Sequence, residues 1–413
     1  MLRLPANFQR LLTAQAISNV GDGVTLVAMP LLATHYTREP VLVAGAAVAQ
    51  GLPWLFFSLH AGVVVDRLDR RQLMIAADTL RFVVLFLFGI VVLTDFGGIA
   101  LLYIVAFILS TAETVYGSAA QSIIPQVVGG DDKALDTANG RIEATAVSGQ
   151  EFIGPALGGL LFAAALSMPF LLDSLTFAAS ALLLLRMQGR FSAVPSSTIA
   201  ASPRRSILRE ITEGIRWIRR DPVLLLTTAL IGFASFFHGS VWALLVLFAR
   251  DILLVSPAVF GLLWGIGAAG DLLGSLATGR LRRLLGAGRA ITAAVAFTGV
   301  GYLIIGLSSN VVLFSVGLAV SGFSMVTGSI VLVSLRQRLT PDRLLGRVSS
   351  AIRLSIRGLA PLGALFGGLV AHHFGGVRTP FLFAGVMTLA AAVVTGPTLL
   401  RRLAAVGAKA RPQ

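Results

Sequence analysis

Gly62-Val63-Val64-Val65-Asp66-Arg67-Leu68-Asp69-Arg70-Arg71 is a charged stretch between two long apolar runs. Two apolar runs that cross a membrane as a helical hairpin need a polar connector between them. The glycine at the start of the stretch would let two backbones approach closely. The stretch therefore predicts the turn of a membrane hairpin.

The composition excludes a water-soluble protein. Of the 413 residues, 56% are hydrophobic and 13% are charged, and the mean hydropathy is +0.86. A soluble domain has about 25% charged residues. The net charge of +14 would suit nucleic acid only on a folded soluble module with a basic face. Because the basic residues lie in short clusters between apolar runs, we expect no nucleic-acid partner and interpret the clusters as determinants of membrane orientation.

Several kinds of site are excluded or not expected. The sequence has no cysteine, which excludes disulfides, thiolate metal sites and cysteine nucleophiles. His372-His373 has no further ligand nearby in sequence, so we expect neither a metal site nor a cofactor. Met1 to Arg10 is too short and polar for a signal peptide, so we expect the first apolar run to be retained as a span.

Twelve apolar runs come close to the length that a membrane-spanning helix needs. A hydrocarbon core of about 30 Å requires about 20 mostly apolar residues. Length and the near-absence of charge separate such runs from other buried helices. The predicted spans are residues 12–34, 41–63, 73–94, 99–119, 144–166, 169–187, 223–249, 256–279, 290–309, 311–335, 348–372 and 379–400.

The basic residues predict the orientation of these spans. Of the 33 basic residues, only Arg38, Arg250 and Arg378 lie in the connectors that follow odd-numbered spans. Nearly all others lie in the connectors that follow even-numbered spans or at the termini. Basic residues are enriched in cytoplasmic loops. We therefore predict a multi-pass cell-membrane protein with both termini in the cytoplasm.

The longest connector divides the chain into predicted domains at residues 1–187 and 223–413, with a linker at 188–222. The part from Ser192 to Ser202 is rich in Ser, Ala and Pro, which is typical of a flexible segment. Further on, isoleucines at helical spacing lie among arginines, which predicts an amphipathic helix on anionic lipid; binding of a soluble partner is the alternative. This stripe consists of Ile207, Ile211, Ile215 and Ile218.

The two predicted domains resemble each other weakly. Gly154 to Leu160 in the fifth span has a counterpart in Gly363 to Leu369 in the eleventh, 209 residues later, and Gly62 has a counterpart in Gly274, 212 residues later. Two matches at nearly one offset indicate a six-plus-six duplication.

The pattern Gly62-x-x-x-Asp66-Arg67-x-x-Arg70-Arg71 between the second and third spans resembles the signature loop of the major facilitator superfamily of secondary transporters. The resemblance implies an all-α integral membrane fold, with twelve transmembrane helices in two six-helix bundles. It also implies a gate. Asp66 would lie near the N-terminus of the eleventh helix in the outward-facing state, where the helix dipole favours negative charge.

The remaining arginines of this loop would complete a charge cluster that breaks when the cytoplasmic side opens. Asp69 replaces the second glycine that is usual in the family. An ordinary basic hairpin with no gating role is the structural alternative for the loop.

Gly154-Pro155-x-x-Gly158-Gly159 in the fifth span resembles the antiporter motif of drug-exporting members of the superfamily. Proline removes a helix hydrogen bond and bends the helix, and glycines four apart let a neighbouring helix approach. The motif therefore favours export, although small residues are also common at ordinary helix interfaces in membranes.

Ionisable residues inside spans are costly in lipid and are candidates for function. Asp22 and Glu113 lie in the first and fourth spans, which border the central cavity of the fold that the chain resembles, and are the leading proton or cationic-substrate sites. Paired structural carboxylates are the alternative. Glu151 is the third candidate. His238, the histidine at mid-span depth, is a candidate proton relay, and an ordinary hydrogen-bonded interior histidine is its alternative. Asp78 and Arg81, three apart on one helix, predict a local ion pair near the interface.

Smaller patterns resemble the macrolide-efflux and siderophore-exporter branch of drug:proton antiporters. They are Gly21-Asp22-Gly23, Asp78-x-x-Arg81, Asp173-Ser174-x-x-Phe177 and Pro341-Asp342-x-x-x-Gly346-Arg347-Val348. Many such antiporters carry an arginine in the fourth span, and this chain has none there.

We therefore predict a monomeric, proton-coupled exporter of a hydrophobic or amphiphilic small molecule, such as an antibiotic, drug or siderophore, in contact with membrane lipid. A lipid or metabolite carrier of the same fold is one alternative, and a non-transporting receptor or scaffold is another. We expect no enzyme, because no nucleophile, base and metal converge in the sequence.

Overall fold

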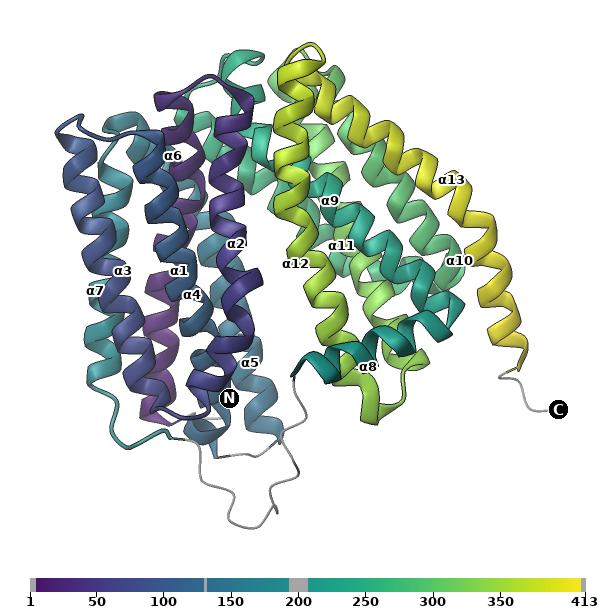
Figure 1. Cartoon of the computed structure of the whole chain (residues 1–413), viewed down its shortest axis with the longest axis horizontal. Helices are drawn as coiled ribbons and strands as arrows, with labels where there is room; N and C mark the ends of the chain where they lie inside the picture. Colours follow the sequence, from purple (N-terminus) through teal and green to yellow (C-terminus); the bar gives the residue numbers. More distant parts are fainter. Residues whose placement is uncertain (1–4, 130–131, 193–206, 410–413) are drawn as a thin grey trace. The chain divides into compact units, whose positions relative to one another are not determined.

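The computed structural model describes residues 5–129, 132–192 and 207–409, and every regular element in these ranges is helical (Figure 1). The chain forms two compact units. Unit 1 comprises Met1–Arg38, Gly45–Ala200 and Ser256–Gly265, and unit 2 comprises Glu39–Ala44, Ala201–Val255 and Ile266–Gln413.

The regular elements of the two halves of the chain have the following bounds. The elements of the N-terminal half are α1 (Ala6–Tyr36), α2 (Pro40–Val65), α3 (Arg70–Leu93), α4 (Ile99–Val128), α5 (Asp132–Ala146), the π-helix η1 (Val147–Ile153), α6 (Gly154–Ala164) and α7 (Met168–Leu185). Those of the C-terminal half are α8 (Ile207–Arg220), α9 (Pro222–Asp251), α10 (Pro257–Leu307), α11 (Val311–Leu339), α12 (Asp342–His373) and α13 (Arg378–Lys409).

Ten helices of the described chain are long and apolar enough to span a membrane, against twelve expected spans. Both differences have a local cause. Two expected spans lie within the 51 residues of α10, which is interrupted at Gly286 by a backbone turn with a φ of 75°. The fifth expected span, 144–166, is divided among α5, η1 and α6, so no single piece reaches the required length.

Pro155 accounts for the division of the fifth span. It is the second residue of α6, two residues after the last residue of the π-helical turn η1. Proline has no backbone N–H and its ring displaces the carbonyl four residues before it, which favours a local widening of the helix. The predicted helix distortion at Pro155 is therefore present as a π-turn.

Glycine packing repeats between the two halves of the chain. A Cβ on Gly158 of α6 would lie 2.5 Å from Val24 O of α1. A Cβ on Gly367 of α12 would lie 2.7 Å from Ser240 O of α9. The two glycines are 209 residues apart and their partners 216 residues apart. The internal repeat thus extends from the sequence to the contacts between helices.

The other repeated glycine behaves differently. A Cβ on Gly62 would meet no described atom within 4 Å, whereas one on Gly274 would overlap the Phe323 carbonyl of α11. Within the described part of unit 1, no other helix lies against Gly62, so the close approach of two backbones expected there is not present in this unit.

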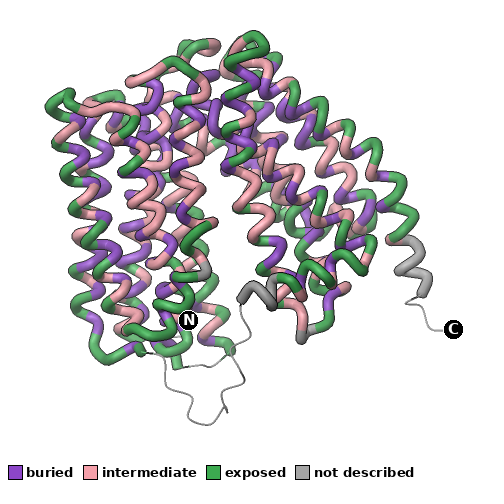
Figure 2. Tube along the Cα trace, viewed as in Figure 1, coloured by how far each residue is buried: buried purple, intermediate pink, exposed green. Residues whose placement is uncertain are grey.

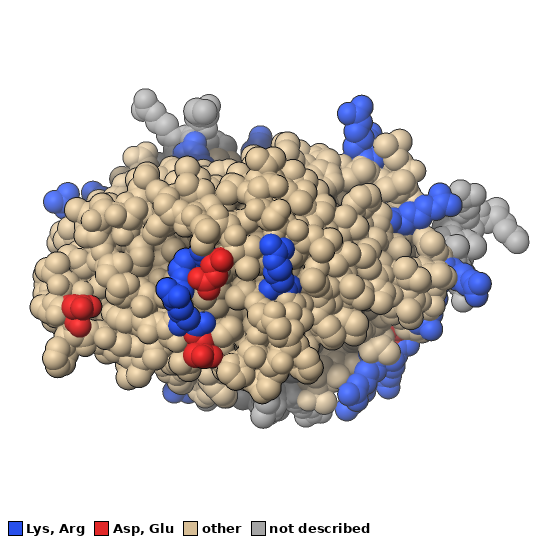
Figure 3. All heavy atoms as spheres, turned by 90° about the horizontal axis from the view of Figure 1, so that it is seen from above, with Lys and Arg blue, Asp and Glu red and all other residues tan. Residues whose placement is uncertain are grey.

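Buried and exposed residues alternate along the helices of both units (Figure 2). In unit 1 one apolar core is built around the fully buried side chains of Phe8, Leu11, Met74 and Leu184. In unit 2 another is built around Ile291, Val331 and Leu399. Charged side chains are sparse on the face shown in Figure 3, as a charged fraction of 13% leads one to expect.

The predicted amphipathic helix is α8, and it packs against α12. Ile218 is buried with Val348 and Ile352, and Arg347 Nη1 lies 2.5 Å from Glu213 Oε2. Ile215 is 38% exposed. The expectation that the whole stripe lies on lipid is wrong for Ile218, because α12 covers it. The predicted flexible segment lies outside the described residues from 193 onward.

Candidate functional site

Arg81 of α3 lies between carboxylates from three helices of unit 1. Its Nη2 atom is 2.5 Å from Asp22 Oδ1 of α1 and 2.7 Å from Glu113 Oε2 of α4, and its Nη1 atom is 3.5 Å from Asp78 Oδ1 on its own helix. The Arg81 side chain is 3% exposed, whereas those of Asp22 and Glu113 are 21% and 46% exposed. One buried guanidinium thus joins three helices, and two of its partners reach the surface of the unit.

A fourth carboxylate, Asp173 of α7, lies beside this group and is buried. Thr25 of α1 donates a hydrogen bond to its Oδ2 atom, and Thr176 donates to its Oδ1 atom at 3.0 Å. Gly21 makes the approach possible, because a Cβ there would overlap both the Asp173 carboxylate and the Thr176 hydroxyl. We call Asp22, Asp78, Arg81, Glu113 and Asp173 together the Arg81 cluster.

Two aromatic rings enclose the guanidinium. The Cζ atom of Arg81 lies 4.0 Å from the ring centroid of Phe177 and 5.7 Å from that of Tyr116. Both rings are buried. A cation held against aromatic faces away from water gains about 2 kcal/mol. The rings therefore hold the guanidinium in place while its two exposed partners stay accessible.

The structure brings together the two leading candidates, Asp22 and Glu113, and adds Asp78, Arg81 and Asp173, which the sequence reasoning did not place in a transport site. The expected ion pair between Asp78 and Arg81 is present at 3.5 Å, and the same guanidinium also pairs at shorter distances with Asp22 and Glu113. Arg81 and Asp173 are charged residues inside predicted spans, and that signal alone marks them as candidates.

The other two candidates lie outside the Arg81 cluster. Glu151 is in η1, and its side chain is hydrogen-bonded to Trp264, which belongs to the same unit. His238 of α9, in unit 2, stacks against Trp242 with ring centroids 5.2 Å apart, and its buried Nδ1 atom makes no hydrogen bond to a described residue. No group of three or more His, Asp or Glu residues among those described is arranged to hold a metal ion.

The signature loop is anchored to unit 1 by its second half. Asp69 accepts hydrogen bonds from the backbone N–H groups of Gln72, at 3.1 Å, and Phe191, at 2.8 Å. It therefore caps the N-terminus of α3 and also holds the chain that follows α7. This is the turn that the aspartate forms in place of the family's usual glycine.

The two last arginines of the loop bind backbone carbonyls of helices in the same unit. Arg70 Nη1 donates to Ser122 O at 3.1 Å, and Arg71 donates to Leu184 O at 2.8 Å and to Leu185 O at 2.6 Å. Leu184 and Leu185 end α7, where carbonyls lack partners within the helix and an arginine is favourable, whereas Ser122 lies inside α4. Asp66 and Arg67 are exposed.

The glycine-proline motif supports α1 directly beside the Arg81 cluster. A Cβ on Gly154 would lie 2.6 Å from Val20 O, two residues before Asp22. Gly159 faces the start of α10, where a Cβ would lie 3.0 Å from Gly261 Cα. The motif thus sets the distance between α6 and the helix that carries Asp22.

Known families and relatives match nearly the whole chain. The family described as "Transmembrane secretion effector" matches residues 4–412. The multidrug efflux pump Tap of Mycolicibacterium fortuitum is 26% identical over 401 residues, covering 92% of this chain and 94% of the relative. Macrolide efflux protein A of Streptococcus pyogenes is 26% identical over 403 residues, covering 94% of each chain.

Solved structures of major facilitator proteins share the fold. The nucleoside transporter NupG has a TM-score of 0.74 at 12% identity, covering 97% of this chain and 99% of that one. A bacterial homologue of the iron transporter ferroportin has a TM-score of 0.73 at 19% identity, with the same coverage. At such identities the likeness concerns the fold alone.

Proposed function

Because this chain belongs to the transmembrane secretion effector family of major facilitator transporters, we propose that it exports a hydrophobic or amphiphilic small molecule in exchange for protons. Its relatives include efflux pumps for drugs and macrolides by name. The observation that carries the coupling proposal is the Arg81 cluster, in which one buried guanidinium is shared by Asp22 and Glu113.

The charge balance of the Arg81 cluster favours the binding of a further cation. Four carboxylates face one guanidinium, so full ionisation would give the Arg81 cluster a net charge of −3. An uncompensated charge costs several kcal/mol in a low-dielectric interior. A proton or a cationic substrate lowers this cost. Glu113 is the carboxylate through which a proton exchanges, because its side chain is 46% exposed.

Exchange follows from competition for the same carboxylate oxygens. Protonation of Glu113 weakens its attraction to Arg81 and leaves the guanidinium with Asp22. A substrate that offers a cation or a hydrogen-bond donor competes with the proton for these oxygens. Binding of one then disfavours the other by the same factor in both directions, which is the thermodynamic requirement for antiport.

Purified protein in proteoliposomes with a pH-sensitive dye inside tests this coupling. Addition of a transported compound from a panel of amphiphilic dyes and antibiotics should move protons in the opposite direction. Glu113→Gln should reduce this movement at least tenfold. Glu143→Gln, which changes an exposed carboxylate of α5, is the matched control and should not. Proton movement that persists in Glu113→Gln contradicts the site, and its absence in the wild type across the panel contradicts antiport.

We also propose that both chain ends lie in the cytoplasm and that Asp66 and Arg67 act as the gating pair. In support, basic side chains gather at one end of unit 1. Arg10 and Arg71 bind backbone carbonyls at the end of α7 there, and Arg70 binds the Ser122 carbonyl of α4. Asp66 is exposed beside the part of the loop that Arg70 and Arg71 hold in place, so its carboxylate can bind another helix when the gate closes.

A further inference from the structure

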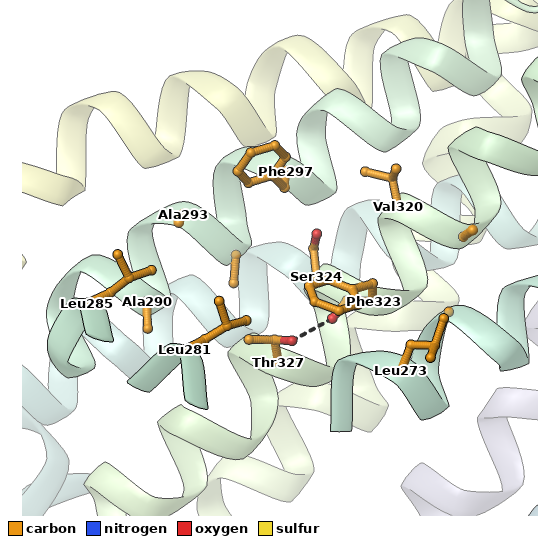
Figure 4. A pocket seen from close by; sticks show the side chains of 13 residues that line it. Leu273, Leu281, Leu285, Ala290, Ala293, Phe297, Val320, Phe323, Ser324 and Thr327 are labelled. Atoms are coloured by element: carbon orange, nitrogen blue, oxygen red, sulfur yellow. Dashed lines mark hydrogen bonds between the residues drawn. The ribbon is translucent and has the colours of Figure 1, made fainter. Parts of the chain in front are cut away.

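An apolar groove of about 430 Å³ lies in unit 2 between α11 and the two arms of α10, residues 257–285 and 287–307 on either side of Gly286 (Figure 4). Leu273 and Leu281 of the first arm, Phe297 of the second and Val320 of α11 surround it. Its volume is in the range of small-molecule sites, about 300–1,000 Å³. The groove is therefore large enough to hold a chain-like apolar ligand.

The groove offers almost no polar recognition. Ser324 and Thr327 carry the only hydroxyl groups among its lining residues. The Thr327 hydroxyl donates to Phe323 O at 2.7 Å and lies 3.3 Å from Gly274 O, so it is already bound to backbone. A ligand in this groove must be held by apolar contact.

The groove opens on the surface of unit 2 at the depth of the spans. Leu273 is 60% exposed and Phe297 is 57% exposed, and both belong to α10, which is apolar enough to cross a membrane. At this depth the surrounding solvent is hydrocarbon. The medium that meets the open groove is thus the bilayer.

One end of the groove is basic. Leu285 lines both the groove and an open depression of about 460 Å³ beside the Gly286 turn. Arg289, after the turn, and Arg401 of α13 line this depression. Both arginines are exposed. Basic pockets between spans, next to the membrane surface, suit anionic lipid headgroups.

We propose that the groove and the depression together bind one anionic phospholipid, with an acyl chain along α11 and the phosphate between Arg289 and Arg401. The order of the two parts supports this occupant. An apolar slot at hydrocarbon depth continues, through Leu285, into a basic depression, and a phospholipid has the same succession of chain and anion. This site lies within unit 2 and requires neither the Arg81 cluster nor transport.

Native mass spectrometry of the purified full-length protein tests the proposal. The protein is delipidated in detergent and offered phosphatidylglycerol or phosphatidylcholine with identical acyl chains. We expect wild type to retain phosphatidylglycerol on the order of tenfold better. The double variant Arg289→Gln/Arg401→Gln should lose this preference. Arg283→Gln, an exposed arginine of the first arm that lines neither pocket, is the matched control and should keep it.

A second variant tests the chain-binding part. Ala293→Phe fills the groove and should reduce the retention of both lipids several-fold, with an unchanged elution volume as the check on folding. Equal retention of the two lipids by wild type overturns the proposal. So does a headgroup preference that survives the double arginine variant. A transported compound can also be added to compete with the bound lipid. If it displaces the lipid equally well from wild type and from the double arginine variant, the groove is a substrate path and the lipid proposal is overturned.

Discussion

Nη2 of Arg81 lies 2.7 Å from Oε2 of Glu113, so an arginine of the third span faces a carboxylate of the fourth. In many drug:proton antiporters, which this chain resembles, the fourth span itself carries an arginine. Here α3 supplies the guanidinium and α4 supplies the acid. Unit 1 therefore contains a buried guanidinium beside the fourth span, although the arginine that carries it belongs to the third span.

Removal of Arg81 should destabilise the protein. Arg81→Gln leaves the buried Asp78 and Asp173 without their cation, and a broken buried pair costs about 3–5 kcal/mol. Thermal unfolding in detergent, followed by size-exclusion chromatography with fluorescence detection, should show a lower Tm. Arg81→Lys should recover part of the loss, because an ammonium keeps the charge but lacks the planar fork that meets two carboxylates.

A double variant provides the control for this prediction. Asp22→Asn in the Arg81→Gln background removes one of the uncompensated charges, so the second change should cost less than Asp22→Asn costs alone. Strictly additive changes in Tm would show that the two residues do not interact.

Glu113→Gln should separate substrate binding from proton coupling. The amide keeps the shape of the side chain but cannot release a proton. We expect exchange of labelled substrate across proteoliposomes at equal pH to persist, and the response to an imposed pH gradient to disappear. A gradient response equal to that of wild type would assign the coupling proton to another group.

Asp69→Gly, which restores the residue usual in the family, should loosen the start of α3. It removes the acceptor for the Gln72 and Phe191 N–H groups. Replacing a capping Asp by Gly costs about 0.3 kcal/mol, and loss of the second hydrogen bond adds about 0.5–1.5 kcal/mol. Hydrogen exchange of the first turn of α3 should become faster. Asp69→Asn keeps one of the two acceptor oxygens, so it should retain the Gln72 cap with little change in the first turn of α3 and lose only the bond to Phe191. An equal effect of both variants on that turn would argue against capping.

Gly158→Ala should impair the protein more than a glycine change elsewhere in the same unit. Its Cβ would lie 2.5 Å from Val24 O, and overpacking of this kind costs about 1–3 kcal/mol. Gly140→Ala in α5 is the control, since its Cβ would meet no described atom within 4 Å. Alanine there should be neutral or stabilising. Tm and substrate exchange of both variants check the difference.

Much of the architecture can be predicted from the sequence, because every segment that crosses the hydrocarbon core must be long, apolar and helical. Apolar length predicts the spans. Pro155 marks where one of them departs from a regular helix, and Gly286 lies in the turn between two others. Ion pairs are less predictable. Asp78 and Arg81 are three residues apart and suggest each other, yet the nearer partners of Arg81 are 59 and 32 residues away.

The sequence by itself determined that this protein is a helical membrane transporter with two related halves. Apolar length, charge distribution and glycine spacing are properties of contiguous segments, so they can be read without the tertiary structure. Tertiary structure alone decided that α1, α3, α4 and α7 place four carboxylates around one guanidinium, and that Asp69 caps α3 while holding Phe191. Such contacts depend on the rotation of each helix about its own axis. That rotation is fixed by packing among helices, for which linear spacing carries no signal.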